Sequence, residues 1–463
     1  MIKFGTDGWR AVIAEDFTFE NLRVVSQAIA DYAKKNKKGG KRIVVGYDCR
    51  FLSREFAQTC CEVFAGNGMK TVLSDQAIPT PTVSFHCLHR KYDLGIMMTA
   101  SHNPAHFNGL KIKTRDGGAA DNTVTSAVEK LLGQRKPKTL SLDKAKKKAL
   151  FRTADLTRDY VSFLRGFVDV KKIRKLKARV LVDTMYGAGD TFVEKILGKT
   201  SLEINYLHNE YNPSFGGMHP EPVPVNLQAL IKGVRKGGYD LGVALDGDAD
   251  RIAIIDSKGN FISAQTLLPL LAVHMVKNRH ASGGIGKTVV GSNLIDQVAS
   301  MLNVACYETP VGFKYISNLF KEKVICIGGE EAGGIGVKGY VPERDGSASF
   351  LLLLEMLAVE KKSFQELLTL LYRQCGRWYY RRESIPVASV KKSLEQMKLP
   401  AEILGKEILR VNTLDGVKLI TKNSWLMFRK SGTEPIVRVY AEAKTNKEVG
   451  QLLKLGKKMI YAL

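Results

Sequence analysis

Three stretches of the chain repeat one pattern: a short β-branched strand, a turn of small or polar residues, a helical segment and a second strand. The first strands are predicted at residues 42–46, 179–183 and 287–291. The helical segments follow at residues 53–67, 190–196 and 294–302, and the second strands at residues 70–73, 202–206 and 304–307. A strand, a helix and a strand in this order predict a βαβ unit. We therefore expect three α/β domains of similar build in tandem.

The C-terminal part of the chain has a different pattern. From about Glu383 short strand-like segments dominate, and a helical segment over residues 446–461 closes the chain. This order predicts a fourth, smaller α+β domain. A length of 463 residues leaves room for several domains of about 150 residues or fewer. We predict domain I at 1–155, domain II at 156–256, domain III at 257–372 and domain IV at 373–463.

The net charge of +24 raises the question of a nucleic-acid or membrane partner. Half of it lies in residues 131–180, which hold sixteen Lys and Arg against four Asp. No aromatic side chains interleave with the lysine clusters of this stretch as in a base-stacking platform, so a solvated surface is the preferred interpretation. A polyanion- or nucleic-acid-binding protein stays a distant alternative.

Two further observations concern location. The chain begins without an apolar signal segment, and no apolar run approaches the ~20 residues of a membrane span. Seven cysteines form no CxxC pair, which argues against a thiolate zinc site and favours reduced thiols. We expect a cytoplasmic protein with no membrane partner.

The sharpest local motif is an acidic turn between two apolar strands. Asp246, Asp248 and Asp250 alternate with small residues, and Arg251 follows them. Three carboxylates in one tight turn can converge on a hard divalent cation, and without a counter-ion they would repel one another. The EF-hand pattern is absent, because Arg251 stands where that loop needs Gly. The turn therefore predicts a metal site, with a solvated acidic turn as the alternative.

Three other loops follow predicted strands. Thr99-Ala-Ser101-His102-Asn-Pro104 places a hydroxyl at a strand end, but it lacks the G-x-S-x-G elbow of a hydrolase. Glu330 and Glu331 lie in a glycine-rich loop and suit hydrogen bonding to sugar hydroxyls. Residues 429–435, with Arg429, Ser431, Gly432 and Thr433, combine a guanidinium, hydroxyls and backbone N–H groups into a phosphate cradle. Each loop could also be a plain turn.

One segment imitates a nucleotide-binding loop. Residues 281–288 nearly fit the Walker A pattern, with Ala281 in place of the first Gly. A P-loop lies between a strand and a following helix. Here a helical segment precedes the motif and a predicted strand at 289–290 follows it, so we exclude nucleotide binding there.

Together these motifs resemble the α-D-phosphohexomutase family, the phosphoglucomutase/phosphomannomutase group. The resemblance covers the whole chain, and its motifs occur in the family's order. They are Phe4-Gly-Thr-Asp-Gly-Trp-Arg10, Gly46-Tyr-Asp-Cys-Arg50, Thr99–Pro104, Asn108-Gly-Leu-Lys111, Asp246–Arg251, Thr309-Pro-Val-Gly-Phe-Lys314, Gly329-Glu-Glu and Arg429–Pro435. The family fold has three similar α/β domains and a C-terminal α+β domain around a central cleft.

The resemblance implies a role for each motif. Ser101 is carried as a phosphoserine, and Mg²⁺ is held by Ser101, Asp246, Asp248 and Asp250. The catalytic set is Ser101, His102, Lys111, Arg10 and Arg251; the sugar-binding set is Glu330, Glu331 and Arg344; the phosphate-binding set is Arg429, Ser431, Gly432 and Thr433. The implied reaction interconverts hexose 1-phosphate and hexose 6-phosphate, with hexose 1,6-bisphosphate as intermediate and activator and sugar phosphates as the small-molecule partners.

Departures from the family pattern bear on the sugar. Ala332 stands where Ser is frequent, Gly334 where some members have His, and Arg344 where Lys is usual. The sugar loop lacks the Glu-Gln-Ser form of phosphoglucosamine mutases, and Ala249 is not their usual Gly. We therefore expect glucose or mannose phosphates as substrates. The alternatives are a phosphoglucosamine mutase and a non-catalytic sugar-phosphate-binding relative.

Overall fold

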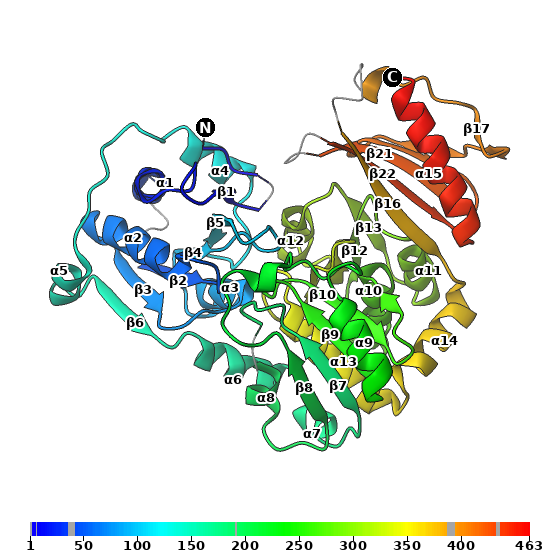
Figure 1. Ribbon diagram of the computed structural model, residues 1–463, viewed down its shortest axis with the longest axis horizontal. Coiled ribbons are helices and arrows are strands. Elements are labelled where there is room, and N and C mark those ends of the chain that lie inside the picture. Colours follow the sequence, from blue (N-terminus) through cyan, green and yellow to red (C-terminus); the bar gives the residue numbers. More distant parts are fainter. Residues whose placement is uncertain (1, 6, 36–41, 190–191, 387–393, 432–435) are drawn as a thin grey trace.

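A computed structural model describes residues 2–5, 7–35, 42–189, 192–386, 394–431 and 436–463. The sheets follow one another along the chain, and each is accompanied by helices (Figure 1). The N-terminal and C-terminal sheets stand on either side of the two middle sheets (Figure 1). The expected class, three α/β domains followed by an α+β domain, is confirmed.

Domain I is built on a mixed sheet with strand order β1-β5-β4-β2-β3-β6. Strands β4, β2, β3 and β6 are parallel, and β5 runs antiparallel between β4 and β1. The strands are β1 (Trp9–Val12), β2 (Arg42–Tyr47), β3 (Lys70–Ser74), β4 (Leu94–Met98), β5 (Phe107–Thr114) and β6 (Phe151–Ala154). The helices are α1 (Phe19–Lys35), α2 (Ser53–Gly66), α3 (Thr80–His89), α4 (Asn122–Glu129) and α5 (Leu142–Lys147).

Domain II carries the second predicted βαβ unit, with strand order β11-β10-β9-β7-β8. Strands β9 and β10 form an antiparallel pair, whereas β7 is parallel to both of its neighbours. The strands are β7 (Arg179–Asp183), β8 (Glu203–Leu207), β9 (Leu241–Leu245), β10 (Ile252–Asp256) and β11 (Phe261–Ile262). The helices are α6 (Thr157–Phe167), α7 (Val170–Ile173), α8 (Phe192–Leu197), α9 (Gln228–Gly237) and the short η1 (Phe215–Gly217).

Domain III repeats the unit, with strand order β13-β12-β14-β15. The strands are β12 (Gly284–Thr288), β13 (Cys306–Thr309), β14 (Ile325–Gly329) and β15 (Ile335–Val337). The helices are α10 (Ala264–Val273), which continues into η2 (His274–Asn278), α11 (Asn293–Met301), α12 (Phe313–Lys321), α13 (Gly346–Glu360) and α14 (Phe364–Cys375).

The prediction of a strand at residues 287–291 is wrong in its position, because β12 begins at Gly284 and ends at Thr288. The glycines hide it from a search for β-branched residues. A Cβ at Gly284 would lie 2.3 Å from the carbonyl oxygen of Ala305, so the segment that leads into β13 packs directly against the backbone of β12. The segment that imitates a Walker A loop therefore ends as a buried strand. A P-loop would follow a strand, whereas this segment itself forms one, which supports the exclusion of nucleotide binding. The predicted strand at 289–290 was placed just after the observed strand β12.

Domain IV is an antiparallel sheet with strand order β16-β22-β21-β20-β19, packed against one helix. The strands are β16 (Tyr379–Pro386), β19 (Arg410–Asn412), β20 (Val417–Ile420), β21 (Ser424–Lys430) and β22 (Ile436–Ala443), with a separate pair, β17 (Glu402–Ile403) and β18 (Lys406–Glu407). Helix α15 spans Asn446–Tyr461 as predicted, and η4 covers Leu394–Gln396.

The hydrophobic cores show how the domains are joined. Domains II and III share one continuous core that reaches from Val180 to Phe350, whereas domain I and domain IV have cores of their own. A small cluster that includes Val289 and Trp425 joins domain IV to domain III.

The exposure of the basic residues and the state of the cysteines agree with the predictions. All sixteen Lys and Arg of residues 131–180 are exposed, as the surface interpretation predicted, and all seven cysteines are free thiols. No helix in the described part of the chain combines the length and apolar character that a membrane crossing requires.

Candidate active site

Four loops carry most of the predicted site residues, and each joins an antiparallel pair of strands. The serine loop joins β4 to β5, the acidic turn joins β9 to β10, the glutamate loop joins β14 to β15, and the arginine loop joins β21 to β22. A direct hydrogen bond links the serine loop to the acidic turn, and Arg344 bridges the acidic turn and the glutamate loop. The site is thus assembled from several domains rather than from one sheet edge.

The serine loop is held in a strained shape. Ser101 is fully buried and has a positive φ of 53°, which is unusual for a residue with a Cβ. The guanidinium of Arg50, itself buried, donates to four carbonyl oxygens of the loop, those of Ser101, Asn103, Pro104 and Phe107, at 2.6 to 3.0 Å. Asp48 pairs with the same guanidinium at 3.2 Å. Arg50 therefore fixes the backbone that presents the hydroxyl.

The acidic turn meets this hydroxyl. Ser101 Oγ donates to Asp246 Oδ2 at 2.9 Å, and Asp246 Oδ1 accepts from the backbone N–H of Arg251. Asp246, Asp248 and Asp250 are fully buried, and one carboxylate oxygen of each lies within 4.8 Å of the others. Serine and carboxylates from two domains thus face a single point.

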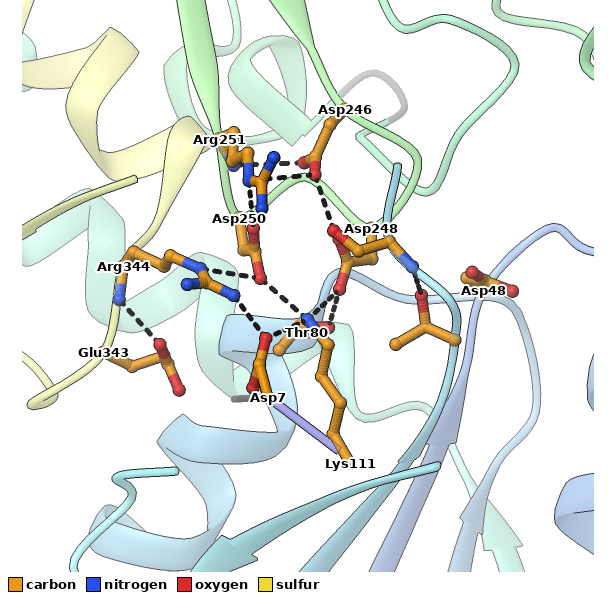
Figure 2. Close-up of polar contacts among 12 residues, drawn as sticks. Asp7, Asp48, Thr80, Lys111, Asp246, Asp248, Asp250, Arg251, Glu343 and Arg344 are labelled. Carbon is orange, nitrogen blue, oxygen red and sulfur yellow. Dashed lines mark hydrogen bonds and ion pairs between the residues drawn. The ribbon is translucent and has the colours of Figure 1, made fainter. Parts of the chain in front are cut away.

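A buried lysine neutralises part of this negative charge. Lys111 lies on β5, and its Nζ is 2.8 Å from Asp248, 2.9 Å from Asp250 and 2.8 Å from Asp7 (Figure 2). Thr80 adds a hydrogen bond of 2.5 Å to Asp248. The neighbouring inward-facing residue of β5, Lys113, is buried and pairs with Glu343.

Arg344 connects the acidic turn with the glutamate loop. Its Nε lies 2.9 Å from Asp250 Oδ2 and its Nη2 pairs with Asp7 (Figure 2). Its Nη1 donates to Glu330 at 2.9 Å. Arg251 lies on the other side of the turn, 3.9 Å from both Asp246 and Asp250. The predicted residues Ser101, Lys111, Asp246, Asp248, Asp250, Arg251, Glu330 and Arg344 therefore form one connected network.

Burial and neighbouring charges shift the pKa values of the network in opposite directions. Burial, reinforced by Asp250 and Asp248, raises the pKa of Asp246 well above its usual range. Burial would also raise the pKa values of Asp248 and Asp7, but the surrounding donors and cations, Lys111 foremost and Arg344 among them, together outweigh burial and lower both pKa values. Burial lowers the pKa of His102, and the cations Arg251, Arg10 and Lys111 lower it further. The imidazole beside Ser101 is therefore neutral at pH 7.

The acidic turn fits a divalent cation. Asp248 Oδ1 and Asp250 Oδ1 are buried without a hydrogen-bond partner, although the second oxygen of each carboxylate contacts Lys111. Buried carboxylate oxygens without donors are costly unless a cation binds them. Oxygen ligands of this kind suit Mg²⁺. The carboxylate oxygens without a hydrogen-bond partner are thus available as ligands for a metal ion.

In the described part of the chain, no ion pair joins the other predicted residues directly to the acidic turn. Arg10 donates to Asn103 at 2.8 Å and lies 3.8 Å from Asp7. The carboxylate of Glu331, predicted to bind the sugar, pairs with Arg382 of domain IV at 3.1 Å. Arg429 pairs with Asp415 at 2.8 Å. Ser431, two residues further along the chain, is buried. Gly432 and Thr433 lie outside the described residues.

Several residues of the network were not predicted. Asp7 bridges Lys111 and Arg344, Arg50 fixes the serine loop, and Thr80 binds Asp248. Asp7 and Arg50 belong to motifs that carry the family resemblance, so their motifs could have indicated them. Thr80 has no such signal, because it begins a helix in a region without any motif.

Comparison with known proteins accounts for most of the chain. Family descriptions of phosphoglucomutase/phosphomannomutase match in order: α/β/α domain I at residues 1–138, domain II at 158–259, domain III at 263–375 and the C-terminal domain at 384–454. The chain belongs to the phosphoglucomutase/phosphomannomutase family. The enzymes of this family are intramolecular phosphotransferases of the isomerase class, and this chain is one of them.

Individual relatives are similar over their full length. A phosphoglucomutase/phosphomannomutase of Thermococcus kodakarensis is 30% identical over 99% of this chain and 98% of its own. A phosphoglucosamine/phosphogalactosamine mutase of Sulfurisphaera tokodaii is 31% identical over the same shares. A crystal structure from Thermus thermophilus, described as that of a phosphomannomutase, superposes with a TM-score of 0.89 at 32% identity and covers 99% of both chains. The relatives therefore differ in the sugar that their names give.

Proposed function

We propose that this chain interconverts hexose 1-phosphate and hexose 6-phosphate, of glucose or mannose, through a phosphoserine at Ser101. The observation that carries the proposal is the 2.9 Å contact between Ser101 Oγ and Asp246 within a buried, three-carboxylate turn. A serine hydroxyl at a metal turn is the arrangement that phosphoryl transfer needs, since the transfer depends on position and charge neutralisation. Mg²⁺ bound by Asp246, Asp248, Asp250 and Ser101 would supply charge neutralisation for the phosphoryl group.

The chain's own residues fill the remaining roles. In the first step the P–O bond to Ser101 Oγ breaks and a P–O bond to the free sugar hydroxyl forms. The hydroxyl proton passes by way of the neutral imidazole of His102 to the departing Ser101 Oγ, which becomes a hydroxyl again. Lys111, Arg251 and Arg10 stabilise the charge on the transferring group. After the hexose 1,6-bisphosphate has turned over in the cleft, its other phosphoryl group returns to Ser101. Glu330, oriented by Arg344, would bind sugar hydroxyls, and Arg429 with Ser431, Gly432 and Thr433 would hold the other phosphate.

Mass spectrometry of the intact protein tests the phosphoserine. We expect one phosphate on the wild type, its loss in Ser101→Ala together with mutase activity, and its retention in a variant of the exposed control serine, Ser126→Ala. Full activity of Ser101→Ala would disprove the mechanism. Asp248→Asn should leave Ser101 in place but weaken the activation by Mg²⁺.

Parallel assays identify the sugar. Glucose 1-phosphate, mannose 1-phosphate and glucosamine 1-phosphate are compared with Mg²⁺ and a trace of hexose 1,6-bisphosphate as activator. We expect the first two to be converted faster than the third, because the loop carries Ala332 in place of a hydroxyl side chain. Preference for glucosamine 1-phosphate would indicate a phosphoglucosamine mutase, and negligible rates on all three would indicate a sugar-phosphate-binding relative.

A further inference from the structure

Domain I has a second concave site at the edge of its sheet opposite to the serine loop. A cavity of about 420 Å³ lies at the amino ends of neighbouring parallel strands, next to the link between α5 and β6. Arg42 and Lys70 are the first residues of β2 and β3, and Arg152 is the second residue of β6. A volume of this size lies within the range of small-molecule sites, about 300–1,000 Å³.

The cavity is strongly cationic. Its wall contains Arg42, Lys70, Lys146 and Arg152 and no carboxylate side chain. In the described part of the chain, no ion pair joins any of these four side chains to an acidic residue. This contrasts with Arg10, Lys111 and Arg344, which all pair with carboxylates in the catalytic network. Four unpaired cations around one hollow repel one another, and a multiply charged anion would relieve that repulsion.

Buried, largely apolar side chains line the walls between the cations. Val72, Tyr92 and Phe151 are buried, and the guanidinium of Arg42 stacks over the ring of Tyr92 at 4.7 Å. Stacking of this kind holds a guanidinium in a fixed plane, which suits it to bind a phosphate through two N–H groups. Because Tyr92 is covered by Arg42, its ring is not available to stack on a nucleic-acid base. The surroundings therefore favour a small anion over a nucleic acid.

We propose that this cavity is a second binding site, for a small phosphorylated molecule with at least two negative charges. It is separate from the catalytic cleft. Strand β2 has Arg42 at one end and Tyr47 at the other, and six residues in a strand span roughly 17 Å. Figure 1 shows α5 and β6 at the outer edge of domain I, away from the acidic turn between β9 and β10. The proposal also gives a role to two cations, Lys146 and Arg152, of the basic stretch 131–180.

Calorimetric titration with inorganic pyrophosphate in magnesium-free buffer tests the proposal. The cavity variant is Lys146→Ala with Arg152→Ala, and the control is Lys171→Ala with Lys175→Ala. Both remove two exposed cations from the same basic stretch, so they lower the net charge equally. We expect the cavity variant to lose one pyrophosphate site or to bind it at least about tenfold more weakly, since charged hydrogen bonds are lost. The control should bind like the wild type.

A third variant separates the cavity from the cleft. Arg429→Ala should remove any pyrophosphate binding at the proposed phosphate cradle and leave the cavity site unchanged. Equal binding by the cavity variant and the wild type, or an equal loss in the control, would overturn the proposal. A third outcome would overturn it as well: the protein does not bind pyrophosphate saturably but binds a DNA duplex, and the cavity variant and the control weaken this DNA binding equally. That is the behaviour of a nonspecific basic surface.

Discussion

At the scale of single residues, the position of the Ser101 hydroxyl depends on a buried side chain from another loop of domain I. Arg50 donates to four carbonyl oxygens of the serine loop. A guanidinium can do this because its N–H groups fork in one plane, whereas an ammonium is a point charge with three donors. Since Ser101 has a strained backbone, the loop would relax once these hydrogen bonds were lost.

Arg50→Lys should therefore keep the positive charge but lose the planar set of hydrogen bonds to the serine loop. We expect kcat to fall by about 10- to 100-fold because the hydroxyl is misplaced, with a smaller change in KM. Steady-state kinetics measures both constants. The exposed neighbour Arg54→Lys on α2 is the matched control and should behave like the wild type. Wild-type kcat in Arg50→Lys would show that charge alone is sufficient.

A second prediction concerns Asp345, next to Arg344 in the chain. Burial raises its pKa to about 6, although it accepts from the backbone N–H of Ala348 and from the hydroxyl of Tyr160. A carboxyl whose pKa is higher in the folded state stabilises the fold below its unfolded pKa, and this contribution is lost as the pH rises through about 6. Between pH 5 and pH 7.5 the loss amounts to about 1 kcal/mol of unfolding free energy.

Asp345→Asn keeps the size and shape of the side chain but removes the titratable carboxyl group. Relative to the wild type, the variant should therefore gain about 1 kcal/mol of stability from pH 5 to pH 7.5. Urea unfolding of both proteins at the two pH values measures the difference. A stability difference that does not change with pH would contradict a raised pKa at this position.

At the scale of elements, the acidic turn and the serine loop touch through their backbones. Gly247 lies between two of the aspartates, and a Cβ at this position would be 2.5 Å from the carbonyl oxygen of Ser101. Backbone atoms of two domains cannot both keep their places around such a methyl group. The absence of a side chain here is what allows the two loops to meet.

Gly247→Ala should separate Ser101 from the carboxylates. A displacement of about 1 Å at a reacting group can cost about 100-fold in rate, and we expect a loss of that order. Gly166→Ala, on helix α6, is the control, because a Cβ there meets nothing within 4 Å. Mutase assays and thermal unfolding of both variants decide the question. Wild-type activity in Gly247→Ala would mean that the loops need not be in contact.

The sequence predicted most elements, and the exceptions have physical causes. β2 and β7 were found from their β-branched residues, whereas β12 was misplaced because its glycines serve close strand packing. Within the site, the three aspartates and Ser101 could be predicted from local motifs. Thr80 contacts Asp248 only through the fold, which no local spacing encodes. The basic cavity likewise joins residues that are far apart in sequence.

At the scale of the whole molecule, the domains are joined with unequal strength. Domains II and III share a continuous core, whereas domain IV is attached to domain III by a small cluster around Trp425 and by hydrogen bonds, among them those of Lys418 and Glu442 with the backbone of domain III. One arginine of β16 adds polar contacts across the domains: Arg382 lies 3.1 Å from Glu331 of domain III and 3.6 Å from Glu221 of domain II. We expect these ion pairs to hold domain IV over the cleft, where its Arg429 can reach the substrate phosphate.

Arg382→Ala should then raise KM for the hexose phosphate. Because Arg382 is one-third exposed, the pair is partly screened and the increase should be only about two- to fivefold. Its neighbour Arg381 donates to Asn446 within domain IV, so Arg381→Ala is a control that leaves the domain contacts intact. A double-mutant cycle with Glu331→Gln separates two roles for Glu331. If the pair acts as a unit, the two substitutions have non-additive effects on KM. If Glu331 binds the sugar itself, their effects add, and the ion pair is not what positions domain IV.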